Sequence, residues 1–439
     1  MNKSYIKIHG GKKLSGEIKV AGAKNISTKL MALSTIGGEF EFRNVPDITT
    51  LDSLTDILKI LGAKVDWNKD KGIIKIDSRV IKNNPIDVET YFHSSSAYMF
   101  LPIIISRLGK FRLYKDKART DAGGDAIGTR KFEQTFDNLS KVGIKTNEGA
   151  DYYDCYLDSK EPILIEDAKS SQGISTFMLY AAMTKNGESK ISNYSKDLEF
   201  LEILKFVSNT TSNIEYDENT IRVKGPINIA KASFDVIADR NDFATLVSAV
   251  VITKSKVSIS NVDVSKLQVE TLLKVLDELG VKYKVSEDRF IIEDYRVAKP
   301  VEIVAGLYPK FFTDWQPLIA PVLALTKGTS SIVETWYTDR LKYWNELGKL
   351  GASFAFYKDD RIDFYENDNP RAVKIEGVDK FVGTDVDALD VRAGAAVVIA
   401  GLAAEGETRV YNNAEHIDRG YENLVGRLAD IGADIEVVG

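Results

Sequence analysis

Cysteine, histidine and long apolar runs are scarce in this sequence of 439 residues. The single cysteine, Cys155, excludes a framework of intrachain disulfides and is typical of a reducing compartment. The three histidines, His9, His93 and His416, lie far apart, so we expect no metal site. No apolar run reaches the length of a transmembrane helix, and the first residues contain no apolar segment typical of a secretory signal. These absences predict a cytoplasmic protein that does not insert into a membrane.

Basic residues are also outnumbered, with 58 Lys and Arg against 64 Asp and Glu, which gives a net charge of −6. That balance argues against a general nucleic-acid binder, because such proteins carry a basic surface. Hydrophobic residues make up 44% of the chain, which is enough for a sizeable core. A chain of this length is too large for a single core, so we expect two domains.

One helical pattern occurs six times in the sequence. In its first copy, residues 51–65, leucine and isoleucine recur at helical spacing, and Gly62 then ends the helix before a strand. The equivalent positions follow one another at intervals of 68 to 81 residues and are Gly62, Gly143, Thr211, Gly280, Gly351 and Gly432. A recurrence of this kind predicts an internal repeat.

Each repeat also contains an earlier helix that is apolar on nearly all sides. These helices are expected at residues 24–36, 94–108, 171–184, 241–253, 313–326 and 391–404. Helices of this kind are buried all round, whereas the amphipathic helices lie outside them. The pattern predicts an α/β fold of six β-α-β-α-β-β repeats, three per domain, with the buried helices at the centre. The predicted domains are residues 23–236, and residues 1–22 together with 237–439.

Polar side chains gather where the buried helices begin. Lys24 starts the first of them, although a helix N-terminus favours an anion over a cation. Taken alone, Lys24 is explained by a surface lysine whose amine reaches solvent. Other repeats also carry polar residues at this junction, and these are Lys169, Ser171, Asp239, Asp242, Asp314, Asp390 and Arg392. We interpret the shared placement as one functional site.

Residues 118–134 form a glycine-rich loop with the sequence ARTDAGGDAIGTRKFEQ. The loop does not match the dinucleotide-binding pattern, and it lacks the lysine of a P-loop. Two interpretations stay open. It is either an ordinary surface connection or a lid that carries Asp125 as a proton donor and Arg130 as an anion ligand.

Four arginines, Arg130, Arg340, Arg392 and Arg419, stand at loop ends beside helix starts. A single arginine at such a position is usually a solvated charge. Four of them together with Lys24 favour a small ligand that carries both carboxylate and phosphate, because a guanidinium group binds either one in a bidentate manner.

Five short motifs connect these residues to a known family, and they are AGAKN, GGDAIGTR, FFTDWQ, DVRAG and HIDRGYE. From residue 7 to the C-terminus the chain resembles the enolpyruvyl transferases, in particular the branch that acts on UDP-N-acetylglucosamine. AGAKN does not match the K-S-x-x-x-R pattern of the shikimate-phosphate branch. The resemblance implies two inside-out α/β barrel domains that close over substrate.

The activity implied by this resemblance is transfer of an enolpyruvyl group from phosphoenolpyruvate to the 3-hydroxyl of UDP-N-acetylglucosamine. Phosphate is released through a tetrahedral ketal, in the first committed step of peptidoglycan synthesis. The resemblance implies no metal and no organic cofactor. The implied partners are the two small-molecule substrates, with no obligate protein partner.

The resemblance also implies roles for individual residues. Lys24 and Asn25 would hold phosphoenolpyruvate. Asp125, at a position where most members have cysteine and some have aspartate, would donate a proton to the methylene carbon, and its carboxylate implies resistance to fosfomycin. Asp314 would orient or deprotonate the acceptor hydroxyl.

Arginines would form the anion pocket in this family. Arg130, Arg340, Arg392 and Arg419 would bind phosphoenolpyruvate, with Asp390 holding one of them. The nucleotide sugar would contact Asp314, Arg130, Trp336, Lys169, Ser171, Gln172 and Gly173.

Two segments depart from the family pattern, and both are on the nucleotide-sugar side. Ser95 stands in the place of a family arginine, with His93 as a possible substitute. Glu133 stands in the place of an aspartate that contacts uracil. Two alternatives therefore remain, the same chemistry on a different acceptor and a non-catalytic paralogue with a binding or regulatory role. The intact set of Lys24, Asp125, Asp314, Arg392 and Arg419 argues against the second.

Overall fold

The computed structural model describes residues 4–84, 95–114, 132–169, 171–295, 299–362, 369–412 and 416–439. Asp125, Arg130 and His93 lie outside these ranges. Ser95 and Glu133 lie in described helices, but their side chains are not described. In the described part of the chain, no helix is long and apolar enough to cross a membrane.

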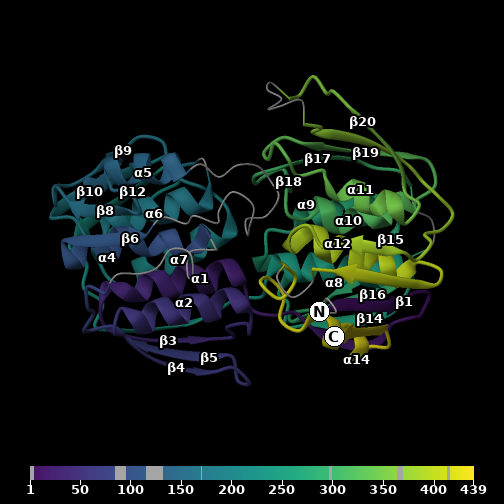
Figure 1. Ribbon diagram of the computed structural model, residues 1–439, viewed down its shortest axis with the longest axis horizontal. Helices are drawn as coiled ribbons and strands as arrows, with labels where there is room; N and C mark the ends of the chain where they lie inside the picture. The colour runs from purple at the N-terminus through teal and green to yellow at the C-terminus, as the bar shows by residue number, and fades with distance from the viewer. Residues whose placement is uncertain are drawn as a thin grey trace. The chain divides into compact units, whose positions relative to one another are not determined.

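The chain divides into two compact units (Figure 1). Unit 1 contains the described residues up to Ala21 together with Ala238–Gly439, and unit 2 contains the described residues from Gly22 to Ile237. The chain passes from one unit to the other at two adjacent places. The backbone N–H of Ala23 donates to the oxygen of Ile237 (2.9 Å), and the N–H of Asp239 donates to the oxygen of Ala21 (2.8 Å).

Inner helices fill the centre of each unit, as the sequence predicted. They are α1 (Lys24–Leu33), α4 (Leu101–Leu108) and α6 (Gln172–Ala182) in unit 2, and α8 (Arg240–Ile252), α10 (Gln316–Ala324) and α12 (Val391–Ala403) in unit 1. Within unit 1 the three helices pack against one another. Small residues allow close packing in α12, where a Cβ on Gly401 would lie 2.9 Å from Cδ1 of Ile8.

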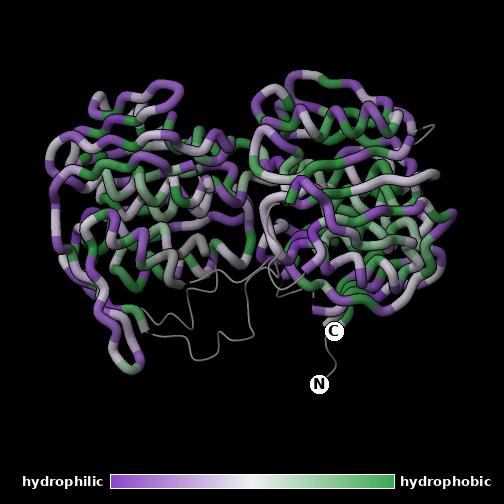
Figure 2. Tube along the Cα trace, turned by 90° about the horizontal axis from the view of Figure 1, so that it is seen from above, coloured by the Kyte–Doolittle hydropathy of each residue, from purple (hydrophilic) through white to green (hydrophobic). Residues whose placement is uncertain are grey.

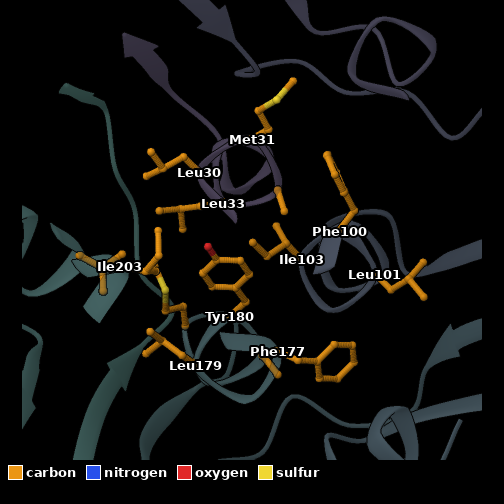
Figure 3. Packing of buried hydrophobic residues seen from close by; sticks show 14 of the residues in the cluster. Leu30, Met31, Leu33, Phe100, Leu101, Ile103, Phe177, Leu179, Tyr180 and Ile203 are labelled. Atoms are coloured by element: carbon orange, nitrogen blue, oxygen red, sulfur yellow. The ribbon is translucent and has the colours of Figure 1, made fainter. Parts of the chain in front are cut away.

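The core of unit 2 is centred on the ring of Tyr180, which lies among apolar side chains from α1, α4 and α6 (Figure 3). Its hydroxyl group points toward α1 and donates to the backbone oxygen of Lys29 (2.7 Å). The short 3-10 helix η2 (Ser95–Phe100) precedes α4 and contributes Phe100 to the same cluster. Hydropathy along the chain agrees with this arrangement, because the helices inside each unit are largely hydrophobic (Figure 2).

Six outer helices follow in the described residues, one per repeat, and they are α2 (Thr49–Ile60), α5 (Phe132–Lys141), α7 (Leu198–Thr210), α9 (Glu270–Glu278), α11 (Tyr343–Lys349) and α14 (Leu424–Asp430). Helix α2 buries its leucine and isoleucine face, and Gly62 follows it with φ of +87°. This left-handed conformation costs glycine little, which explains the recurring glycine. In the third repeat Thr211 is extended (φ −152°), so α7 ends without a left-handed residue.

The sheets of unit 1 have the orders β22 (Asp385–Asp387), β23 (Glu407–Tyr411), β1 (Tyr5–His9), β24 (Asp434–Val438); β15 (Val281–Val285), β16 (Arg289–Tyr295), β14 (Lys256–Ser260), β2 (Ser15–Lys19); and β18 (Phe311–Phe312), β17 (Glu302–Gly306), β19 (Thr329–Glu334), β21 (Ala372–Glu376), β20 (Ser353–Tyr357). Those of unit 2 have the orders β11 (Ile214–Tyr216), β12 (Thr220–Gly225), β10 (Gly187–Ser192), β9 (Leu164–Ile165); β13 (Lys231–Asp235), β3 (Glu39–Arg43), β5 (Ile73–Asp77), β4 (Lys64–Asn68); and β6 (Lys110–Tyr114), β8 (Tyr152–Leu157), β7 (Ile144–Glu148).

Two repeats exchange their first strands. Strand β2 precedes α1 in sequence but pairs in parallel with β14 of unit 1, whereas β13 precedes α8 and pairs in parallel with β3 of unit 2. Strand β1 completes the sixth repeat, because it lies antiparallel between β23 and β24. The predicted α/β class and repeated helix pattern are confirmed, and the exchange explains why the chain crosses twice.

Candidate active site

The N-termini of α8, α10 and α12 are joined by side chains within unit 1. The indole nitrogen of Trp315, which precedes α10, donates to Oδ1 of Asn241 on α8 (2.9 Å). On the other side, Nε of Arg392 on α12 lies 3.5 Å from Oδ2 of Asp314. These contacts bring three of the predicted helix starts to one place.

Asp314 is the centre of this cluster. Its Oδ1 accepts a hydrogen bond from Nη2 of Arg340 (2.8 Å), and its Oδ2 faces Arg392. The side chain of Asp314 is 21% exposed, whereas those of Arg340 and Arg392 are 2% and 7% exposed. The structure thus places an accessible carboxylate between two buried guanidinium groups.

Arg392 keeps its charge although it is buried. Burial lowers the pKa of its guanidinium, but Tyr421, Asp314 and Asp239 raise it, and the net direction is upward. Its carbon Cζ lies 5.0 Å from the ring centroid of Tyr421. Its Nη1 is buried without a hydrogen-bond partner among the described residues. A buried cationic donor of this kind suits an anionic ligand.

Asp239 and Asp390 act as helix caps. Oδ1 of Asp239 accepts from the backbone N–H groups of Asn241 (2.7 Å) and Asp242 (3.3 Å) at the start of α8. Oδ1 of Asp390 accepts from the N–H groups of Arg392 (2.7 Å) and the next residue (2.8 Å) at the start of α12. Asp390 therefore fixes the backbone of Arg392 through a hydrogen bond from its N–H group.

Asp242 has a different role in the same unit. Its two oxygens accept from Nη1 and Nη2 of Arg427 (2.8 and 2.9 Å), and its Oδ2 also accepts from the backbone N–H of Ala21 (2.9 Å). Arg427 donates in addition to the oxygen of Lys19 (2.9 Å). This largely buried pair ties the segment that leaves unit 1 to helices α8 and α14.

Sequence reasoning missed two residues of this region. Tyr421, in the motif HIDRGYE, lies against Arg392, and its hydroxyl lies 2.8 Å from the hydroxyl of Thr245. Glu334 at the end of β19 is fully buried and accepts hydrogen bonds from Thr313 and from the turn at Trp336. The motif signalled Tyr421, but nothing local in the sequence marked Glu334.

Trp336 and Arg419 lie at more open positions. The side chain of Trp336 follows β19 and is 38% exposed, which is unusual for tryptophan. Arg419 is half-buried in the turn that leads to Tyr421. Both are accessible to a ligand.

In unit 2, the N-termini of α1 and α6 are joined through Lys29. Nζ of this buried lysine donates to the backbone oxygen of Asn25 (2.9 Å) and to Oε1 of Gln172 (2.9 Å). Lys24, the first residue of α1, is partly exposed. Sequence reasoning missed Lys29, although a lysine inside an otherwise apolar helix was a visible signal.

The predicted segment 169–173 starts helix α6. Ser171 caps it by accepting from the N–H of Ile174 (3.2 Å). Lys169 is exposed, and its backbone N–H donates to Oδ1 of Asp167 (3.1 Å). A Cβ on Gly173 would lie 3.2 Å from Cε of Met99, so glycine keeps this helix start close to η2. Within the described ranges no cluster of three or more His, Cys, Asp or Glu side chains is arranged to hold a metal ion.

Comparison with known proteins assigns the family. The model of EPSP synthase (3-phosphoshikimate 1-carboxyvinyltransferase) matches residues 8–428. The chain belongs to the EPSP synthase family of enolpyruvyl transferases. It is 31% identical to UDP-N-acetylglucosamine 1-carboxyvinyltransferase 1 of Clostridium acetobutylicum, with 100% of both chains covered. It is 32% identical to UDP-N-acetylglucosamine 1-carboxyvinyltransferase 2 of Caldanaerobacter subterraneus, with 98% of both chains covered.

Solved structures of this family share the fold. The enolpyruvyl transferase NikO from Streptomyces tendae superposes with a TM-score of 0.87 at 22% identity, covering 99% of both chains. EPSP synthase from Acinetobacter baumannii gives a TM-score of 0.73 at 15% identity, covering 99% of this chain and 100% of that one. The predicted membership of the enolpyruvyl transferase family is confirmed.

Proposed function

We propose that this protein transfers the enolpyruvyl group of phosphoenolpyruvate to the 3-hydroxyl of UDP-N-acetylglucosamine and releases phosphate. The observation that supports this most directly is the accessible carboxylate of Asp314 between the buried guanidinium groups of Arg340 and Arg392. Two relatives that match over 98% or more of their length are named UDP-N-acetylglucosamine 1-carboxyvinyltransferase. The reaction would belong to peptidoglycan synthesis in the cytoplasm, with no obligate protein partner.

The reaction needs a base and an acid. Asp314 orients the acceptor hydroxyl or accepts its proton as the oxygen attacks C2 of phosphoenolpyruvate. Asp125 donates a proton to C3, which gives a tetrahedral ketal. The bond from C2 to the phosphate oxygen then breaks, a proton leaves C3, and the double bond forms again.

Cations stabilise the negative charge that develops on phosphate and carboxylate. In unit 1 the proposed ligands are Arg340, Arg392 and Arg419. Nη1 of Arg392, which has no hydrogen-bond partner among the residues that the structure describes, is well suited to bind an oxyanion, because it is buried and already charged. Lys24, Asn25 and Arg130 complete the proposed binding of phosphoenolpyruvate.

The nucleotide sugar is proposed to bind mainly through the start of α6. The cap at Ser171 leaves the remaining first-turn N–H groups of α6 for the diphosphate. The further proposed contacts are Ser95, Arg130, Glu133, Lys169, Gln172, Gly173, Asp314 and Trp336.

Phosphate release tests this proposal. We expect the purified protein to release phosphate from phosphoenolpyruvate when UDP-N-acetylglucosamine is added, and Asp314→Asn to reduce the rate by about 100-fold or more, the usual scale for a general base. Asp359→Asn, which changes a carboxylate paired with Arg361 in the same unit, is the matched control. Release with some other hydroxyl acceptor alone would contradict the proposed substrate but keep the chemistry.

A further inference from the structure

Glu334 connects two segments that carry the proposed catalytic groups. Its Oε2 accepts a hydrogen bond from the hydroxyl of Thr313 (2.5 Å), and its Oε1 accepts from the backbone N–H groups of Trp336 (2.8 Å) and Tyr337 (3.1 Å). The residue has no exposed surface. Every carboxylate oxygen therefore has a donor, and none of them is water-accessible.

Both segments bear directly on Asp314. Thr313 is the residue before Asp314, and it is itself buried. The turn at Trp336 and Tyr337 leads to Arg340, which donates to Asp314 (2.8 Å). The side chain of Glu334 thus contacts the segments that carry both members of the ion pair between Asp314 and Arg340.

The position of Glu334 is fixed by its own backbone as well. Its N–H donates to the oxygen of Arg371 (2.7 Å), and Nε of Arg371 donates to its carbonyl oxygen (3.0 Å). Burial raises the pKa of the Glu334 carboxyl, and the positive charge of Arg340 opposes that rise. A buried carboxylate costs stability compared with an apolar side chain of similar size, so stability alone does not account for it.

We propose that Glu334 is a positioning residue of the active site, which holds Asp314 and Arg340 in the geometry that orients the acceptor hydroxyl. The inference rests on the proposed function, because it concerns the step in which Asp314 acts. It also places Trp336 through the same carboxylate, on the side where the nucleotide sugar is proposed to bind.

Kinetics of five variants, one of them a control, test this role. Glu334→Gln keeps an acceptor for the two N–H groups, but its amide NH2 donates to the hydroxyl of Thr313, which must then accept where it donates in the wild-type protein. We expect it to lower kcat by about 10-fold, and Glu334→Ala by about 100-fold, which is the usual effect of a small displacement of reacting groups. KM for phosphoenolpyruvate should rise by a smaller factor than kcat falls, because Arg340 is the one proposed ligand of phosphoenolpyruvate that Glu334 is proposed to position.

Thr313→Val removes the partner hydroxyl, and the double variant with Glu334→Gln should be no slower than the slower single variant. The matched control is Glu346→Gln, since Glu346 is also buried in unit 1 but accepts from Asp387 N–H (2.9 Å) and Lys349, away from Asp314. The midpoint of thermal unfolding is measured for each variant. That of Glu334→Gln should equal or exceed the wild-type value.

The outcomes distinguish a failure of this inference from a failure of the proposed function. The inference is supported by a lower kcat in Glu334→Gln and Thr313→Val, an unfolding midpoint of Glu334→Gln at or above the wild-type value, and a normal kcat in Glu346→Gln. Wild-type kcat in Glu334→Gln, or losses that multiply in the double variant, would overturn it while the proposed function stands. A wild-type protein that releases no phosphate with phosphoenolpyruvate and UDP-N-acetylglucosamine overturns the proposed function, and the inference fails with it.

Discussion

Burying a carboxylate at Glu334 makes the stability of the protein depend on pH. Burial raises the pKa of this carboxyl, although the hydrogen bonds from Thr313, Trp336 and Tyr337 and the charge of Arg340 oppose the rise. A carboxyl whose pKa is higher in the folded state binds its proton more tightly there. The folded state therefore loses stability as the pH rises through the raised pKa.

Glu334→Gln removes this dependence, because an amide does not titrate. Relative to the variant, the wild-type protein should be most stable below the unfolded pKa of about 4.3 and should lose that advantage as the pH rises through the raised pKa of the folded state. Unfolding midpoints of both proteins, measured at several pH values, give the difference directly. If the unfolding midpoint of Glu334→Gln exceeded that of the wild-type protein by more and more as the pH fell below about 5, the assigned upward shift of the Glu334 pKa would be contradicted.

Asp125 should make the protein insensitive to fosfomycin. The antibiotic alkylates a thiolate in this family, and a carboxylate is a much weaker nucleophile toward an epoxide. The single cysteine offers no substitute, since Cys155 is buried in β8 and burial raises the pKa of its thiol. Asp125→Cys should gain sensitivity while keeping part of its turnover, because a thiol also donates a proton.

The matched variant, Asp125→Ala, should lose turnover but keep acceptor binding. Mass spectrometry of fosfomycin-treated protein identifies any adduct. An adduct on the wild-type protein, or near-normal turnover of the alanine variant, would contradict the assignment of Asp125 as the proton donor.

Among structural elements, helix α14 is tied to helix α8 by the ion pair between Arg427, whose side chain is 16% exposed, and the buried Asp242. Arg427→Met leaves the carboxylate of Asp242 buried without its cation, which should cost about 3–5 kcal/mol of unfolding free energy. Arg361→Met, at an arginine that is 43% exposed and also pairs with two acids, should cost less than about 1 kcal/mol. Urea denaturation followed by tryptophan fluorescence reports mainly on unit 1, which holds three of the four tryptophans. Equal losses in both variants would show that the buried pair has no special role.

Helices were predictable because each one carries its own local signal. A sequence that is apolar on all sides marked α12. Gly62 marked the end of α2, and the structure gives this glycine a positive φ. The partners of single polar side chains were not predictable, because packing brings them together over long distances in sequence. Thr313 and Glu334 are 21 residues apart, and Lys29 and Gln172 are 143 residues apart.

The candidate site was predictable in part for the same reason. Asp314 and Arg392 stood in recognisable motifs and Arg340 at a loop end beside a helix start, and the structure brings the three together. Trp336 came from the family resemblance, whereas its support by Glu334 depends on the pairing of β19 with the rest of its sheet. Pairing of this kind leaves no mark in a single local segment.

At the scale of the whole molecule, the proposed ligands belong to both units, with Lys24 and Ser171 in unit 2 and Asp314 and Arg392 in unit 1. One substrate that contacts all of them would draw the units together. Small-angle scattering should therefore show a smaller radius of gyration with UDP-N-acetylglucosamine and phosphoenolpyruvate than without them. An unchanged radius at saturating ligand would count against closure, and Asp314→Asn, which keeps the shape of the side chain, is the control for binding without turnover.

The exchange of β2 and β13 dictates an order of assembly on the ribosome. Unit 2 is complete once β13 has been synthesised at Lys231–Asp235, and its sheet can then form. Strands β1 and β2 emerge first but pair later than unit 2 does, because their partner strands are synthesised after it. Strand β2 pairs with β14, and β1 pairs with β23 and β24 near the end of the chain. Since contacts so distant in sequence form slowly, the first segment to be made is among the last to fold, and during synthesis it is an unpaired strand in reach of other chains.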